Sequence, residues 1–389
     1  MVSLADYVDR EQSYVKHVFL ERYLEALAHK TASRYDHVVY VDGFAGPWQS
    51  ANERFEDTSF GIALNALWQA REASKKFGRA VQMSAFLVER QPAAYAQLET
   101  VRARFPDISI KTYRADFLAV LPEILKDIPK GAFAFFFIDP KGWRIPLLAL
   151  KSMLERPNSE IIFNFMFDFI NRAANINGPV VRAGLDELMP YGNWKAKLDE
   201  ADRLADGDLG PTQRKDILVS AFTESLARLG NYQYVAETTV LRSLRDRPLY
   251  CLCYATRHST GIEVFRDCQT KALTEQAKTR ASAKVKHAST STGQGEFFES
   301  LHDMGPNELQ EFLRAELSLA ERVLIDLTPQ QPAAILYEKL WPQVLARHVV
   351  RRPDVNKIAA YLRKKGVLLF PDWEKGKQVP QPQYRTQRP

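Results

Sequence analysis

The sequence predicts an α/β fold in which a mostly parallel sheet is closed by a β-hairpin and followed by a C-terminal winged helix-turn-helix. Three observations lead to this prediction. Five short apolar segments alternate with segments of helical periodicity up to about residue 165. Two further strand-like segments, separated by a short turn, follow near residues 232–256. Beyond residue 337, two helix-like segments precede a basic, hairpin-like end.

The first half of the chain predicts regular strand–helix alternation. Leu20, Leu24 and Leu27 recur at helical spacing and predict an opening amphipathic helix. The strands and helices that follow imply a parallel sheet with right-handed crossovers. Strands are expected at 38–42, 83–88, 108–113, 133–138 and 160–165, and helices near 61–76, 92–104, 117–126 and from Pro146.

The second half predicts an insertion, the closing hairpin and a separate C-terminal domain. A polar, helix-like stretch at 178–210 interrupts the alternation. A helix near 212–228, strands at 232–241 and 248–256, and a helix from Gly261 to about Lys278 are expected to follow it. Residues 288–296 have linker composition. We therefore expect one domain at 1–287 and a second at 297–389.

The C-terminal domain is expected to resemble a winged helix. Helices are expected at 337–346 and from Pro353 to Lys365, the second with an inward face that carries Val355, Ile358 and Leu362 and with Gly366 as its C-cap. Short strands at 367–370 and 378–385 would form the wing.

Charge also distinguishes this domain. Residues 341–389 contain 11 Lys and Arg against 3 Asp and Glu, whereas the remainder contains 42 against 44. This asymmetry indicates a nucleic-acid-binding module, although a solvated helix with a disordered end fits the charge equally well. The candidate contacts to nucleic acid are Lys357, Arg363, Lys364, Lys375 and Lys377.

Composition favours a cytoplasmic protein without membrane contacts. Hydrophobic residues make up 46% of the 389 residues, and no apolar run is long enough to span a bilayer. Cys251 and Cys253 are two residues apart, which is not metal-ligand spacing, and no histidine pair accompanies them or Cys268. We expect these cysteines to be buried small hydrophobic residues and predict no structural metal.

Acidic residues end the predicted strands. Asp42 ends the first strand and is followed by Gly43, Phe44 and Gly46. Glu89 and Asp139 end the second and fourth strands. Ligands in open α/β sheets bind beyond the carboxyl ends of the strands. One such segment alone would fit an ordinary strand-to-helix turn, but the repeated pattern indicates a nucleotide-type cofactor.

Four phrases resemble the three-Cys-motif partner protein family: YVDGFAGP (40–47), FLVER (86–90), FIDPKG (137–142) and IIFNFMFDFINR (161–172). The resemblance extends over roughly residues 15–272. The family name refers to a partner protein, not to cysteines in this chain. The resemblance implies a Rossmann-like, class I S-adenosylmethionine methyltransferase-like core and a possible three-Cys-motif protein as partner.

The resemblance also implies cofactor-binding residues. The loop of Asp42, Gly43, Phe44 and Gly46 would approach the methionine part of S-adenosylmethionine. DNA adenine methyltransferases carry a similar pattern, but with glycine where this chain has Trp48.

Two further acids are candidates for the adenosine part. Glu89 would accept hydrogen bonds from the ribose hydroxyls, or it would cap a helix beside Arg90. Asp116 would bind the adenine amine or, equally, act as the N-cap of the following helix.

The catalytic candidates are Asp139, Pro140 and Trp143. Amino-methyltransferases carry D-P-P-[YFW] here, whereas this chain reads DPKGW, without the second proline and with the aromatic residue displaced by one position. Asp139 and a backbone carbonyl would accept hydrogens from an exocyclic amine, and Trp143 would stack on a flipped base. Alternatively, Asp139 caps a turn.

Polar residues also follow the fifth strand. Asn164, Asp168, Asn171 and Arg172 would either face the same cleft as Asp139 or form an internal hydrogen-bonded network.

These observations predict an S-adenosylmethionine-dependent methyltransferase that acts on a nucleic acid, with or without a partner protein. The alternative is a non-catalytic nucleotide- or nucleic-acid-binding protein with a degenerate core. A nuclease is disfavoured because no acidic pair with a lysine stands out.

Overall fold

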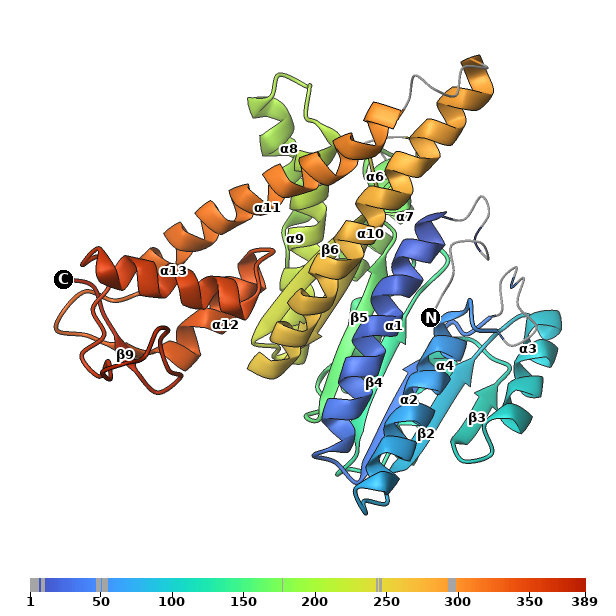
Figure 1. Ribbon diagram of the computed structural model, residues 1–389. Helices are drawn as coiled ribbons and strands as arrows, with labels where there is room; N and C mark the ends of the chain where they lie inside the picture. The colour runs from blue at the N-terminus through green and yellow to red at the C-terminus, as the bar shows by residue number, and fades with distance from the viewer. Residues whose placement is uncertain are drawn as a thin grey trace. The chain divides into compact units, whose positions relative to one another are not determined.

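The computed structural model describes residues 7, 11–46, 50, 55–176, 178–242, 244, 247–292 and 299–389, and the side chains within these ranges except those of 285–292 and 299–306. The chain forms two compact units, Met1–Arg257 and His258–Pro389 (Figure 1). The predicted boundary after residue 287 differs from this division, because helix α10 (Ser259–Thr292), which was expected to close the first domain, belongs to the second unit and runs into the expected linker. No Gly or Pro lies between residues 262 and 292 to end that helix.

The first unit contains a seven-stranded sheet with the order β3-β2-β1-β4-β5-β7-β6. Strands β1 to β5 are parallel to their neighbours, and β7 pairs antiparallel with both β5 and β6. The predicted Rossmann-like, mostly parallel sheet closed by a hairpin is therefore confirmed. The strands are β1 His37–Asp42, β2 Gln82–Val88, β3 Ser109–Tyr113, β4 Phe133–Ile138, β5 Ser159–Phe165, β6 Tyr234–Leu241 and β7 Pro248–Thr256.

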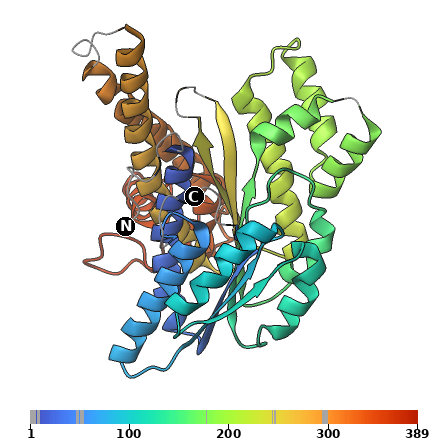
Figure 2. The same cartoon turned by 90° about the vertical axis from the view of Figure 1, so that its right-hand side faces the viewer.

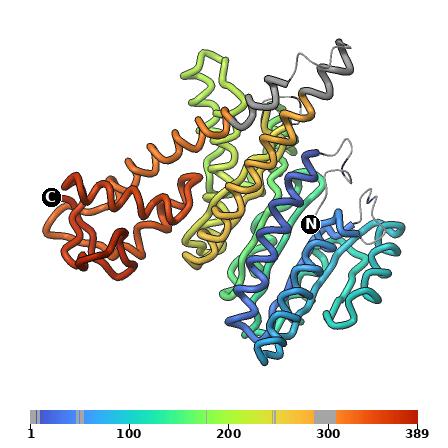
Figure 3. Tube along the Cα trace, in the orientation of Figure 1, coloured from blue at the N-terminus to red at the C-terminus, as the bar shows by residue number. Residues whose placement is uncertain are grey.

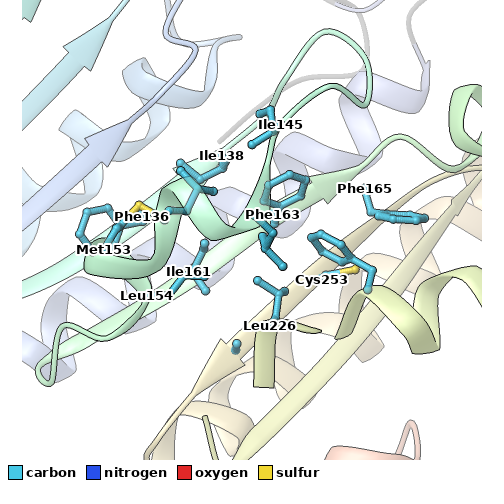
Figure 4. Packing of buried hydrophobic residues seen from close by; sticks show 14 of the residues in the cluster. Phe136, Ile138, Ile145, Met153, Leu154, Ile161, Phe163, Phe165, Leu226 and Cys253 are labelled. Atoms are coloured by element: carbon cyan, nitrogen blue, oxygen red, sulfur yellow. The ribbon is translucent and has the colours of Figure 1, made fainter. Parts of the chain in front are cut away.

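Burial explains why these segments form strands. Every residue of β4 and β5 is buried, as expected for central strands covered on both faces. The edge strand β6 instead alternates buried and half-buried residues. On one face, Phe136, Phe163 and Phe165 pack with Leu226 of helix α9 (Pro211–Gly230) (Figure 4).

Helices cover both faces of the sheet (Figure 2). Helices α1 (Glu11–Ala32) and α2 (Ser59–Lys76) pack on one face, where Leu24 and Ala63 meet Tyr40. Helices α4 (Phe117–Asp127), α5 (Lys151–Leu154) and α9 pack on the other. The remaining helices of this unit are α3 Pro92–Glu99, η2 Thr100–Arg104, η3 Leu147–Leu150, α6 Phe167–Ala174, α7 Pro179–Leu188 and α8 Trp194–Leu204. The predicted insertion at 178–210 corresponds to α7 and α8.

The second unit, traced in Figure 3, begins with α10 and α11 (Glu299–Leu327). Helix α11 was not expected from the sequence. Strand β8 (Ile335–Leu336), helices α12 (Tyr337–Arg347) and α13 (Arg352–Lys364) and strand β9 (Arg385–Thr386) follow. The two predicted helices are confirmed, and the predicted C-cap Gly366 has φ +73°. Val355 and Leu362 are buried as expected.

The expected wing differs from the structure. Residues 378–385 do not form a strand along their length. Instead, β9 pairs with β8, and Leu369 forms an isolated bridge with Gln387. Pro380 and Pro382 explain the difference, because proline has no N–H to donate to a strand ladder.

All three cysteines are buried and free, which confirms the prediction that they act as small hydrophobic residues. Cys253 lies among the aromatic and aliphatic side chains of the core (Figure 4). Burial raises the pKa of the Cys251 thiol far above its usual range, so the thiolate is disfavoured. No helix in the part of the chain that the structure describes is long and apolar enough to cross a membrane.

Candidate functional site

Both carboxylate oxygens of Asp42, at the end of β1, accept hydrogen bonds from other groups of the protein. Its Oδ1 accepts a hydrogen bond from the Phe44 amide at 3.0 Å, and its Oδ2 accepts from the Tyr40 hydroxyl at 3.0 Å and from Ser59 Oγ at 2.7 Å. Burial raises the pKa of this carboxyl to about 6, and the charge of Asp139 adds to the shift. Asp42 therefore stabilises the conformation of the predicted cofactor loop through buried hydrogen bonds.

The loop after Asp42 is tied to the neighbouring strands. The Gly43 amide donates to the Phe137 carbonyl at 3.1 Å, and the Ala45 amide donates to the Val88 carbonyl at 2.8 Å. A Cβ at Gly43 would lie 3.1 Å from the Phe117 ring, so this glycine makes room for α4. Phe44 also packs against Phe117, with 6.0 Å between ring centroids. Gly46 is half-buried, and residues 47–49, including Trp48, lie outside the described residues.

Glu89 and Asp116 each form one local hydrogen bond. Glu89 is buried, and its Oε1 accepts from the Gln91 amide at 2.6 Å, so it caps the turn that leads into α3. Asp116 is exposed, and its Oδ1 accepts from the Leu118 amide at 3.0 Å, which makes it the N-cap of α4. The second carboxylate oxygen of each has no hydrogen-bond partner among the described contacts.

Asp139 at the end of β4 joins three elements. Its Oδ2 contacts the Lys16 ammonium of α1 at 2.7 Å, and its Oδ1 accepts from Asn164 Nδ2 of β5 at 2.6 Å. The side chains of Lys16 and Asp139 are 14% and 20% exposed. The Asn164 Oδ1 is buried without a partner in the described part of the chain.

Lys16 was not among the site residues predicted from the sequence. Its only signal is its place between the buried residues Val15 and His17, and such a pattern does not separate a paired lysine from a solvated one.

The segment after Asp139 turns at Gly142 and packs against α7. Gly142 has φ +124°, a left-handed conformation that favours glycine, and its amide donates to the Pro140 carbonyl at 3.0 Å. The Trp143 ring packs on α7, because a Cβ at Gly184 would lie 2.6 Å from it. Lys141 lies near Glu89 and Asp139, and partial desolvation lowers the pKa of its ammonium while both acids act against the shift.

The polar residues after β5 divide between two roles. Asn164 belongs to the Asp139 site. Asp168 is buried and pairs with Arg172, Arg242 and Arg247, while Asn171 accepts a hydrogen bond from Arg214 Nε at 2.7 Å. The internal network, one of the two alternatives left open by the sequence, is therefore present around Asp168 and Asn171, whereas Asn164 contacts Asp139.

The five predicted nucleic-acid contacts of the second unit are all exposed: Lys357, Arg363, Lys364, Lys375 and Lys377. The Arg363 guanidinium lies 4.1 Å from the Trp373 ring centroid, so α13 is joined to the segment that follows it. Tyr361, which is 50% exposed, is one helical turn from Lys357 and Lys364.

The sequence matches no known family model and no curated protein. The fold is similar to the crystal structure of protein LPL1258 from Legionella pneumophila str. Philadelphia 1, which is described by the family model DUF519. The alignment covers 63% of this chain and 85% of that chain, with 12% sequence identity and a TM-score of 0.37.

Proposed function

We propose that the first unit is an S-adenosylmethionine-dependent methyltransferase that acts on a nucleic acid. The observation that carries this proposal is the strand order, in which β7 alone is reversed and a hairpin closes the parallel sheet. This is the arrangement of class I S-adenosylmethionine methyltransferases. The acids at the ends of β1, β2 and β4 lie at the carboxyl ends of the parallel strands, where ligands of such folds bind.

The hydrogen-bond acceptors at these strand ends fit an adenosine group. Glu89 and Asp116 each retain a carboxylate oxygen that can accept a hydrogen bond, and such charge-assisted bonds suit the ribose hydroxyls and the adenine amine. Asp42 and Gly43 would shape the loop rather than contact the cofactor, because their bonds stay within the protein. When bound, S-adenosylmethionine supplies an electrophilic methyl group.

Asp139 would act on the acceptor amine. Its carboxylate would accept a hydrogen from an exocyclic amine and so orient the nitrogen lone pair. Lys16 and Asn164 hold the two carboxylate oxygens and so fix the orientation of the group.

Nucleic acid as substrate is supported by the second unit. Its exposed lysines lie on α13 and on the segment that follows. The order β8, α12, α13 and then the Leu369–Gln387 bridge supports the proposed winged helix-turn-helix. The three-Cys-motif partner and the cytoplasmic location stay predictions from the sequence.

Calorimetric titration of the full chain with S-adenosylmethionine and S-adenosylhomocysteine tests the proposal. Glu89→Ala should weaken binding by about 1.5–3 kcal/mol, the range for a hydrogen bond to a charged group. Glu155→Ala, which removes an exposed acid away from the strand ends on the same unit, is the control. If the wild type binds neither ligand at millimolar concentration, the proposal that the chain is a methyltransferase is wrong.

The catalytic step has its own test. Asp139→Ala should abolish methyl transfer to DNA or RNA while it leaves cofactor affinity within about twofold, because Asp139 acts on the acceptor. A variant with wild-type turnover would show that the Asp-Pro element has only a structural role.

A second candidate is a non-catalytic protein that binds nucleotide or nucleic acid. Both oxygens of Asp139 already contact protein groups, and the Trp143 ring packs on Gly184, which favours a degenerate core. Oligonucleotide binding by a chain that does not bind S-adenosylmethionine would identify this function.

A further inference from the structure

We propose that a cluster of arginines around Asp168, together with Phe169, binds the phosphates and an unpaired base of a single nucleic-acid strand. The cluster consists of Arg172 on α6 and of Arg242 and Arg247 at the β6–β7 turn. This inference rests on nucleic acid as the substrate class. It places a contact surface on the first unit, separate from the basic residues of α13.

The geometry brings three guanidinium groups to one buried carboxylate. Arg242 Nη2 lies 2.8 Å from Asp168 Oδ2, Arg172 Nη2 lies 3.3 Å from the same oxygen, and Arg247 Nη2 lies 3.4 Å from Oδ1. The Asp168 side chain is only 5% exposed, so it is the buried partner with which the three arginines pair.

The described residues of the cluster carry an excess of positive charge. Among them, Arg172, Arg242 and Arg247 pair with the one acid Asp168, and the side chains of Arg172 and Arg247 are 59% and 40% exposed. The Arg247 Nε is buried, so the exposed part of this guanidinium is the part that a ligand could reach. Guanidinium groups present planar pairs of donors that match phosphate oxygens, so a phosphate is the ligand that this arrangement suits.

An exposed aromatic ring lies within the cluster. Phe169 is 46% exposed, and the Arg172 guanidinium lies 4.7 Å from its ring centroid. Bases of single strands stack on aromatic rings and on guanidinium planes, whereas bases in a duplex have no free face. The guanidinium covers one face of the partly exposed Phe169 ring, and a base could stack on the guanidinium plane or on the exposed part of the ring, which favours a single strand over a duplex.

The position of the cluster connects it with the Asp139 site. Asp168 is four residues after Asn164, which binds Asp139, so the two Cα atoms are at most about 14 Å apart. The β6–β7 turn follows the carboxyl end of β6, which runs in the same direction as β5. Phosphates that flank a target nucleotide would therefore reach this cluster.

Fluorescence anisotropy with a labelled mixed-sequence oligonucleotide, single-stranded and as a duplex, tests the inference. The full chain is used without cofactor across a range of salt concentrations. Arg172→Gln should lower the slope of log affinity against log salt by about 0.7 for the single strand, the value for one lost phosphate contact. Phe169→Ala should weaken single-strand binding by about 5-fold to 150-fold, as expected for one stacked base.

Matched variants isolate the effect. Arg203→Gln removes an arginine that is 68% exposed and pairs within α8, and Phe77→Ala removes an exposed phenylalanine at the end of α2. Both should bind the single strand as the wild type does. Arg172→Lys keeps the charge and should restore the salt slope, which separates loss of a phosphate contact from damage to the fold.

Several outcomes would overturn the inference. One is that Arg172→Gln and Phe169→Ala both keep the affinity and the salt slope of the wild type. Another is that the control variants lose as much affinity as these two variants do. A third is that the wild type does not bind the oligonucleotide. Tighter duplex binding would overturn the single-strand assignment. Displacement of the oligonucleotide by polyglutamate at equal charge would assign the cluster to an acidic protein. Since no cofactor is present, failure here is distinct from failure to bind S-adenosylmethionine, and success stands even without methyl transfer.

Discussion

Replacement of Asp42 by asparagine should make the protein more stable at neutral pH and remove a pH dependence that the wild type has. The buried carboxyl of Asp42 has its pKa raised from 3.8 to about 6, chiefly by desolvation. The folded chain therefore holds this proton more tightly than the unfolded chain does. The contribution of Asp42 to stability is highest below pH 3.8, falls as the pH rises to about 6, and stays constant above that.

The size of the effect follows from the shift. Two pKa units correspond to about 3 kcal/mol, and about 2 kcal/mol of this is lost between about pH 4.5 and pH 7. Asparagine keeps an oxygen for the Phe44 amide, and its amide can donate to the hydroxyls of Tyr40 and Ser59, which rotate to accept. The variant should therefore keep the loop and lose only the cost of the buried charge.

The assay is urea unfolding of the wild type and Asp42→Asn from about pH 4.5 to pH 7, with Asp36→Asn as the control. The Asp36 side chain is 96% exposed and also carries an ion pair, with Arg79. The stability of Asp42→Asn relative to wild type should rise by about 2 kcal/mol across this range, while the control stays level. A difference that does not change with pH, or that falls as the pH rises, would refute the reasoning.

Two further predictions concern lysines. Lys16→Met should destabilise the protein by about 1–3 kcal/mol in thermal or urea unfolding, because it leaves a largely buried carboxylate without its cation. Lys111→Met should have little effect, because its ion pairs are exposed, and equal effects of the two would contradict the assigned geometry. Replacement of Lys357 and Lys364 by alanine should lower the salt slope for duplex DNA by about 1.8, whereas Lys278→Ala on α10 should leave it unchanged; an unchanged slope in the double variant would exclude α13 as the duplex contact.

Local sequence patterns predicted most of the first unit because its strands are buried on both faces. Strand β4 was expected at 133–138 and is found there, since an unbroken apolar run between turn residues fits a central parallel strand. The N-cap role of Asp116 was likewise one of two predicted roles, because a cap depends only on neighbours along the chain. Features that depend on short range, such as the C-cap at Gly366, were predicted for the same reason.

Predictions were wrong or missing where distant segments decide the outcome. The strand expected at 378–385 does not form, because its prolines cannot donate to a strand ladder. Residues 385–387 pair instead, with β8 and Leu369 as their partners. The length of α10 also exceeded the expectation from composition, because Ser and Thr only weakly oppose a helix that is already formed.

The sequence by itself determined the α/β class, the strand order along the chain and the acids at the strand ends. Only the tertiary structure decided what those acids contact. The partners of Asp139 lie 123 and 25 residues away in the chain, and those of Asp168 include Arg242, 74 residues away. Periodicity reports which face of an element is buried, but an ion pair depends on which two elements the folded sheet brings together.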